Sequence, residues 1–185
     1  MASMALDEGS MPLYQSIVDL SKMFRYTLRT EAATVALERG ADYVKAYLQL
    51  QRLRYGEELD VRWRIDPGAL KVQVPFNFLQ PVVENAFVHG FDESVHKKLE
   101  ISVEREDAGL KIQVVNTGTE LDEQKLRSIN QGIKSNTSHG LSMLYQKLSA
   151  LYEQEFRFEI GMDGKRHTRF LIGIPVQGDK GERYD

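Results

Sequence analysis

Two hydrophobic stripes with a helical period open the chain. The first has apolar residues at steps of four, three, four and four, at Leu13, Ile17, Leu20, Phe24 and Leu28. Such steps keep the side chains on one face of an α-helix. A second stripe runs over residues 37–55, and Gly56 follows it, where a glycine commonly ends a helix. The pattern predicts two consecutive helices.

After residue 56 the period changes to that of β-strands. Apolar and charged residues alternate over residues 59–65, as in a strand with one buried and one solvent-facing side. Similar patterns predict further strands at residues 99–104, 110–114, 156–160 and 168–174. Turns are expected at Pro67-Gly68, Asp107-Ala108-Gly109 and Asp163-Gly164.

Helices are predicted between these strands, at residues 76–89, 122–131 and 141–152. Because the strands alternate, we expect helices to cover one face of the sheet while the other face meets solvent. The period alone therefore predicts a two-layer α/β sandwich preceded by two helices.

The composition is that of one globular domain, with 42% hydrophobic and 28% charged residues among 185. The net charge of −3 argues against nucleic acid as a partner, because phosphate-backbone binding needs concentrated Lys and Arg. Without cysteine the chain has no disulfide and no cysteine-ligated zinc, which fits a reducing compartment. No apolar run reaches about 18 residues, so no membrane span is predicted.

The first candidate site lies in residues 75–90, where Pro75 suits a helix start. Asn85 and His89 are four residues apart and share a helix face. An amide and an imidazole one turn apart can hold a hydrated magnesium ion and a phosphate between them. The alternative is structural, with Asn85 capping a buried loop and His89 ending the helix.

A second candidate site follows the strand predicted at residues 110–114. Asn116 offers a donor and an acceptor, which suits the edge of a purine. Gly118 allows a flat ligand to approach the backbone closely. A strand followed by a turn and a glycine is common, however, in sheet proteins of many functions.

The third candidate site precedes the helix predicted at residues 141–152. Small hydroxylated residues and a glycine before a helix favour an anion site, because free N–H groups and the helix dipole point there. The alternative is a capped helix start, with Ser138 as the N-cap. The polar stretch between Gly118 and Gly140 resembles a mobile lid.

In combination these segments resemble the C-terminal part of LytS-like sensor histidine kinases, whose ATP-binding domain belongs to the superfamily shared with DNA gyrase and MutL. The family's most specific signature, LQPxVENAxxHG, matches residues 79–90. Its LS…RY element matches Leu20-Ser21 with Arg25-Tyr26, and its YLxIQxxRF helix matches residues 47–55.

Two later motifs stand in the order that the family requires. Asn116-Thr117-Gly118 stands at the adenine-contacting motif, and Gly140-Leu141, with Lys147-Leu148, stands at the second glycine box. The resemblance covers about residues 13–175.

The resemblance implies a Bergerat-type ATP-binding fold. This is an α/β (α+β) two-layer sandwich with a mixed, mostly antiparallel sheet that helices cover on one face, preceded by two helices. The chain is then divided into disordered or added residues at 1–10, a helical segment from the dimerisation and phosphotransfer region at 11–56, the catalytic domain at 57–176, and a loose tail at 177–185.

The resemblance also implies roles for the candidate residues, with ATP and Mg²⁺ as cofactors. Asn85 is expected to coordinate magnesium between the ATP phosphates, and His89 to lie near those phosphates, so these two are the catalytic residues. Asn116 takes the adenine-binding place, and Gly118 lets the base lie against the strand end. The phosphates are expected at the second glycine box, formed by Ser138, His139, Gly140 and Leu141.

The implied activity is that of a protein-histidine kinase. The γ-phosphoryl group of ATP is expected to pass to a histidine and then to the receiver domain of a response regulator. The family's phosphoacceptor lies in an HFLYN-like element, and none of the four histidines here lies in one, so the acceptor is expected outside this chain. The intact protein is expected to be a homodimer and a bacterial inner-membrane sensor, with this part in the cytoplasm.

Several positions depart from the family pattern. Asn116 stands where many relatives have an aspartate, and Val88 stands where many have a lysine. Ser138 replaces the first glycine of the second glycine box, and Met143 replaces an asparagine in the following helix. His167-Thr168 stands where a Gly-Thr pair is frequent. These departures leave open a degenerate nucleotide-sensing or scaffolding module of the same fold. An efficient ATP hydrolase like gyrase is not expected, because Pro81 occupies the place of its water-activating glutamate.

Overall fold

The computed structural model describes residues 11–29, 32–91, 96–107, 109–118, 120–135, 139–163 and 167–176. Its helices are α2 (Met11–Arg29), α3 (Leu37–Tyr55), α4 (Leu79–Asn85), α5 (Glu123–Lys134) and α6 (His139–Tyr152). Its strands are β1 (Thr34–Ala36), β2 (Leu59–Ile65), β3 (Gln73–Pro75), β4 (Lys97–Glu106), β5 (Gly109–Thr117), β6 (Arg157–Met162) and β7 (His167–Pro175).

Five strands form one sheet in the order β2-β4-β5-β7-β6. The β2–β4 pair is parallel and the other three pairs are antiparallel. The two short strands β1 and β3 form a separate antiparallel pair. A mixed, mostly antiparallel sheet is therefore confirmed.

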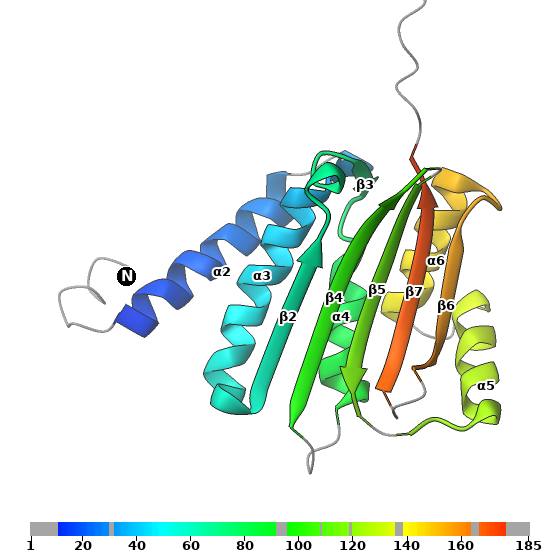
Figure 1. Ribbon diagram of the computed structural model, residues 1–185. Coiled ribbons are helices and arrows are strands. Elements are labelled where there is room, and N and C mark those ends of the chain that lie inside the picture. The colour runs from blue at the N-terminus through cyan, green and yellow to red at the C-terminus, as the bar shows by residue number, and fades with distance from the viewer. Residues whose placement is uncertain are drawn as a thin grey trace, which may run out of the picture.

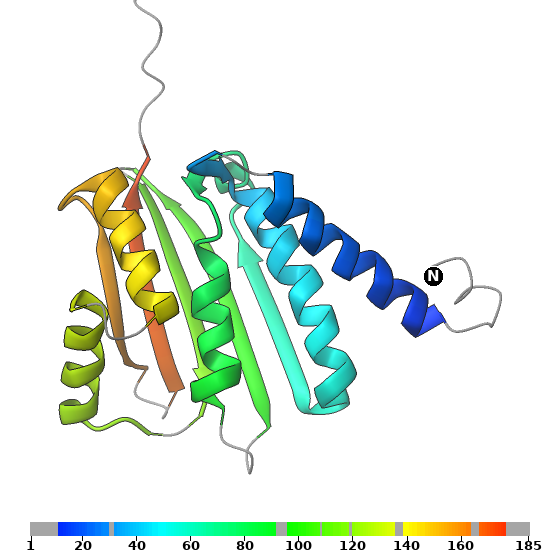
Figure 2. The ribbon, with the colours of Figure 1, turned by 180° about the vertical axis from the view of Figure 1, so that it is seen from behind.

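Helices cover one face of this sheet, and the other face is open. In Figure 1 the strands lie in front of α4 and α6, and in Figure 2, which is turned by 180°, these helices lie in front of the strands. Inward-facing strand side chains such as Ile101, Ile112 and Ile172 are almost completely buried, in one core with Val82 and Leu148 from the helices. The predicted division between a covered and a solvent-facing side is confirmed.

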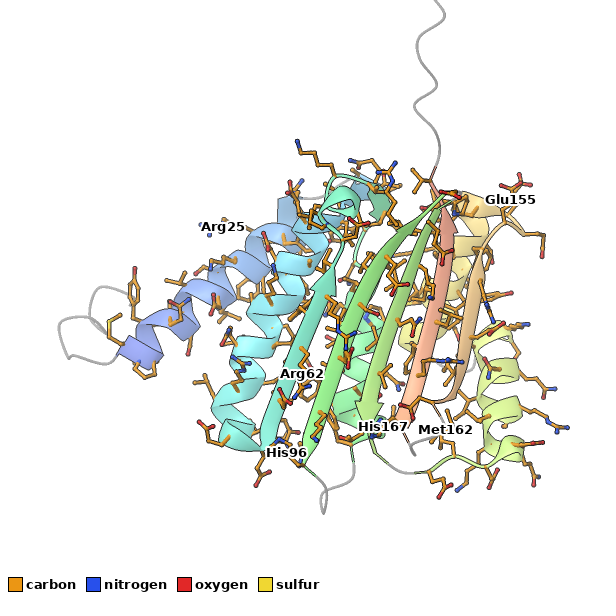
Figure 3. All side chains as sticks on the ribbon, in the orientation of Figure 1. Arg25, Arg62, His96, Glu155, Met162 and His167 are labelled. Carbon is orange, nitrogen blue, oxygen red and sulfur yellow. The ribbon has the colours of Figure 1, made fainter. Side chains whose placement is uncertain are left out.

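Charged side chains occupy the open face. Arg62 of β2 lies there (Figure 3) and pairs with Asp60, and Arg64 contacts the Glu100 carboxylate on the neighbouring strand. Such exposed pairs contribute little to stability, so the covered side holds the sheet together. No helix within the described ranges is long and apolar enough to span a bilayer.

The predicted helix over residues 76–89 needs correction at both ends. Pro75 does not open a helix but ends β3, and Asn77 has a φ of 60°, which no α-helical residue adopts. The helix therefore begins at Leu79. At its far end, the α-helical pattern changes to a π turn over Ala86–Gly90.

Candidate functional site

One pocket of about 490 Å³ opens beside α4 on the helical side of the sheet. Its walls come from α4 and the following π turn, from α5, and from the start of α6, while β6 and β7 provide inward-facing side chains. The lining residues are Pro81, Glu84, Asn85, Val88, His89, Gly90, Leu121, Ile129, Gly140, Leu141, Ile160, Thr168 and Phe170.

Asn85 and His89 lie on the α4 wall, as the spacing predicted. Leu79, Val82 and Val83 are buried, which fixes the orientation of the helix. The π turn closes with a bond from the Phe91 N–H to the Ala86 carbonyl, 2.8 Å long. π turns inside helices are frequent at functional sites. Here the turn carries His89 at the pocket wall.

Phe87 anchors this π turn to the preceding helix. Its ring meets the rings of Tyr47 and Phe91 edge-on, with centroids 5.8 and 5.1 Å away. It also lies beside the ring of Tyr55, again at 5.8 Å. Aromatic pairs at such separations add to the stabilisation from burial. Phe87, two residues before His89, is thereby fixed against α3.

At the end of the π turn the backbone crosses the end of β5. A Cβ atom on Gly118 would lie 1.6 Å from the Gly90 carbonyl oxygen, and one on Gly90 would lie 2.5 Å from Asn116 Nδ2. Only glycines allow the two segments to approach so closely. Gly118 therefore packs against Gly90 and is not part of the pocket lining.

Asn116 is completely buried beside this crossing. Its Nδ2 donates to the Thr117 carbonyl at 3.0 Å, but its Oδ1 has no hydrogen-bond partner within the described part of the chain. Asn116 pairs in register with Thr168, and both Thr168 and Gly90 line the pocket. A buried acceptor without a partner costs free energy. Asn116 itself is not among the residues that line the pocket.

The start of α6 forms another part of the wall. Gly140 and Leu141 line the pocket, and a Cβ on Gly140 would lie 3.6 Å from that of Pro81 on α4. N–H groups in the first turn of a helix lack intrahelical partners and attract anions. Ser138 and the side chain of His139 lie outside the described residues.

Glu84 lies between the pocket and α3. Its carboxylate accepts a hydrogen bond from Gln80 Nε2. Burial, followed by the charge of Glu84, raises the pKa of Tyr47 to about 12. Glu84 thus takes part in hydrogen bonding on α4 and also lines the pocket.

Most of the apolar lining was not predicted from the sequence. Thr168 and Phe170 occupy alternate positions of the last predicted strand, which indicates that they face inward without indicating a pocket. Ile129 belongs to the helix predicted at residues 122–131 and Leu121 precedes it, but the helical pattern does not indicate which part of the sheet this helix contacts. They become lining residues only because α5 packs beside β6 (Figures 1 and 2).

The described residues contain no cluster of three His, Cys, Asp or Glu side chains that could hold a metal. Magnesium does not need such a cluster, because it keeps several waters and binds through one or two protein oxygens together with phosphates. Asn85 places an amide side chain on the pocket wall.

Comparisons with known proteins point to the same kind of domain. The histidine kinase family model matches residues 1–59. The sensor protein kinase HptS of Staphylococcus aureus is 28% identical over 170 residues, which are 89% of this chain and 32% of HptS. The chain thus spans about a third of the length of the curated relatives that it matches.

Solved structures agree on the fold. The nucleotide-free catalytic domain of histidine kinase ThkA superposes with a TM-score of 0.62 and 16% identity, over 80% of this chain and 97% of that one. Full-length ShkA in complex with AMPPNP superposes with a TM-score of 0.56 and 16% identity, over 93% of this chain and 37% of ShkA. The fold is that of histidine kinase catalytic domains.

Proposed function

We propose that this chain is the ATP-binding catalytic domain of a two-component sensor histidine kinase of the LytS-like group. It would transfer the γ-phosphoryl group of ATP to a histidine outside the chain, for relay to a response-regulator receiver domain. The observation that carries the proposal is one pocket bordered by Asn85, His89 and Gly140, with the partnerless Oδ1 of Asn116 beside it.

The residues of this pocket suit the parts of ATP. The Oδ1 of Asn116 would accept a hydrogen bond from the adenine amino group, which requires this side chain, buried beside the lining residues Gly90 and Thr168, to become accessible to the base. Ile129, Ile160 and Phe170 offer an apolar lining to the base. Bound Mg·ATP supplies the transferable phosphoryl group and a cation that offsets its negative charge. Asn85 would hold that cation, and the first turn of α6 would position the phosphates.

The acceptor is proposed to lie elsewhere because none of the four histidines stands in an HFLYN-like element. Of the histidines whose side chains are described, His89 lines the pocket, whereas His96 and His167 do not. His167 shares a shallow depression on the open face with Arg62, and Figure 3 shows it at the start of β7. Its Nδ1 lies 3.0 Å from Asp163 Oδ2. We therefore propose that the phosphoryl group leaves the pocket towards a different segment.

ATP hydrolysis is the less suitable function for this pocket. Pro81 lies on the wall where a hydrolase of this superfamily has its glutamate base, and a proline side chain takes no proton. The carboxylate of Glu84, three residues further on, accepts a hydrogen bond from Gln80 through one of its oxygens. A scaffolding module without catalysis remains the second candidate, favoured by the apolar Val88 at the pocket.

Thermal unfolding with a nonhydrolysable ATP analogue tests the proposal. Analogue and magnesium at about 100 times the dissociation constant should stabilise the fold by about 2.7 kcal/mol. We expect Asn85→Ala to lose the magnesium-dependent part of this shift, and Gln124→Ala, an exposed amide on α5, to keep it. The absence of any shift in the parent chain at millimolar analogue would favour the scaffolding module.

We further propose that α2 serves self-association in the intact protein. Its outward side chains are exposed although apolar, at 49% for Leu13, 44% for Leu20, 58% for Phe24 and 79% for Leu28. A second copy of the same helix would cover this stripe and form a homodimer. We also propose that the intact histidine kinase is a bacterial inner-membrane sensor, that this domain lies on its cytoplasmic side, and that nucleic acid is not a partner.

A further inference from the structure

Asn130 of α5 is bonded to the backbone of a strand as well as to its own helix. Its Oδ1 accepts from the Ile160 N–H at 3.2 Å. Its Nδ2 donates to the Ile160 carbonyl at 2.9 Å and to the Leu126 carbonyl at 2.9 Å. Both amide hydrogens and the amide oxygen are therefore used.

The strand that Asn130 contacts is an edge of the sheet. β6 comes last in the strand order and pairs only with β7 within the sheet described. The side chain of Asn130 offers one donor and one acceptor to Ile160, as a neighbouring strand would. Figures 1 and 2 both show α5 beside β6 at this edge.

The pocket lining depends on this attachment. Ile129, next to Asn130, and Ile160, whose backbone Asn130 binds, both line the pocket. Within one turn of Asn130 on α5, Ile133 is buried and Ser142 Oγ lies 3.5 Å from the Gly132 carbonyl oxygen. In the described part of the stretch expected to be a mobile lid, α5 therefore forms part of the pocket wall.

We propose that Asn130 is a positioning residue that fixes α5 against β6 and so holds the α5 wall of the nucleotide pocket closed. The importance of this wall for ATP rests on the function proposed above. Without the amide, Ile160 keeps its place in the strand through β7, whereas α5 loses its polar attachment to the sheet. The wall then opens more often, and bound nucleotide escapes faster.

Two substitutions separate hydrogen bonding from packing. Asn130→Ala removes the donors and the acceptor. Asn130→Asp keeps the size and the acceptor but removes both donors and places a carboxylate against two carbonyl oxygens. We expect both variants to release a nonhydrolysable ATP analogue about tenfold faster, equivalent to about 1.4 kcal/mol. A packing role alone predicts that Asn130→Asp behaves like the parent.

The experiment combines stopped-flow release of a fluorescent ATP analogue with hydrogen exchange of the unliganded chain. The control is Gln131→Ala, which changes the adjacent, exposed side chain. We expect faster exchange along α5 in both Asn130 variants and faster exchange at the Ile160 amide in Asn130→Ala, which lacks the acceptor, with no change in the control. Release rates within twofold of the parent would overturn the proposal.

If the parent chain binds no nucleotide, the proposed function fails, and the exchange measurement alone decides the role of Asn130. Faster exchange along α5 in the two Asn130 variants then supports its positioning of the wall. Unchanged exchange along α5 overturns it.

Discussion

Buried tyrosines form much of the contact between α3 and its neighbours. Burial raises the pKa of Tyr26 and Tyr43, and burial with the charge of Glu84 raises the pKa of Tyr47 to about 12. The folded state therefore keeps these phenol protons to a higher pH than the unfolded chain does. The resulting contribution to stability is complete below about pH 10 and is lost as the pH rises towards 12.

Tyr47→Phe tests this linkage, because phenylalanine has no proton to release. We expect the free energy of unfolding to fall less steeply between about pH 10 and 12 in the variant than in the parent. Urea unfolding across this range measures the slope. Tyr14→Phe, a change on α2 outside the main core, should leave it unaltered. Equal slopes for parent and Tyr47→Phe would contradict the expectation.

At the scale of single residues, the candidate site residues could be predicted from the sequence, but the contacts between distant segments could not. Asn85 and His89 could be placed on one wall because helical spacing is regular within a short segment. The crossing of Gly90 and Gly118 could not be predicted, because the periodicity of one strand does not say which other backbone meets its end. The partnerless Oδ1 of Asn116 likewise appears only once both segments are placed.

Helix α3 ends at a glycine whose backbone dihedral angles residues with a side chain rarely adopt. Gly56 has a φ of 54° and a ψ of −132°, and its N–H donates to the Arg52 carbonyl. Nothing lies within 4 Å of the position that a Cβ would take, so a side chain there has room. The glycine is required by its dihedral angles alone.

Gly56→Ala should therefore lower the free energy of unfolding by about 1–3 kcal/mol, without any steric clash. Gly161→Ala is the matched control, since its nearest neighbour, Arg169 Nη2, lies 4.0 Å from the added Cβ. We expect the control to change stability by no more than about 0.5 kcal/mol. Urea unfolding of the three proteins gives both values, and equal stability of Gly56→Ala and the parent would rule out a conformational cost.

Long elements were predictable and short ones were not. The five strands of the large sheet and the helices α2, α3, α5 and α6 each repeat their pattern over several residues. β1 and β3 are three residues long, too short to show a period, and their pairing places Pro75 in a strand instead of a helix. The π turn was missed because its residues continue the helical pattern of α4.

For the whole molecule, the exposed apolar face of α2 predicts association in solution. We expect the chain to dimerise in sedimentation-equilibrium experiments and the double variant Leu20→Glu with Phe24→Glu to weaken dimerisation at least about tenfold, because two charges would enter the interface. Leu53→Glu, an equally apolar and exposed position on α3, is the control. An effect of the same size in the control, or a monomeric parent, would argue against the α2 face.

The position of β7 has a consequence for the synthesis of the protein. This strand is the last element described, yet it lies inside the sheet between β5 and β6 and contributes Thr168 and Phe170 to the pocket. While a ribosome is still making the chain, β6 has no neighbour in the sheet and the pocket lacks its floor. A ligand of this pocket can therefore stabilise the domain only after β7 has emerged, and until then the incomplete sheet has an unpaired strand and exposed apolar surface, which favour aggregation.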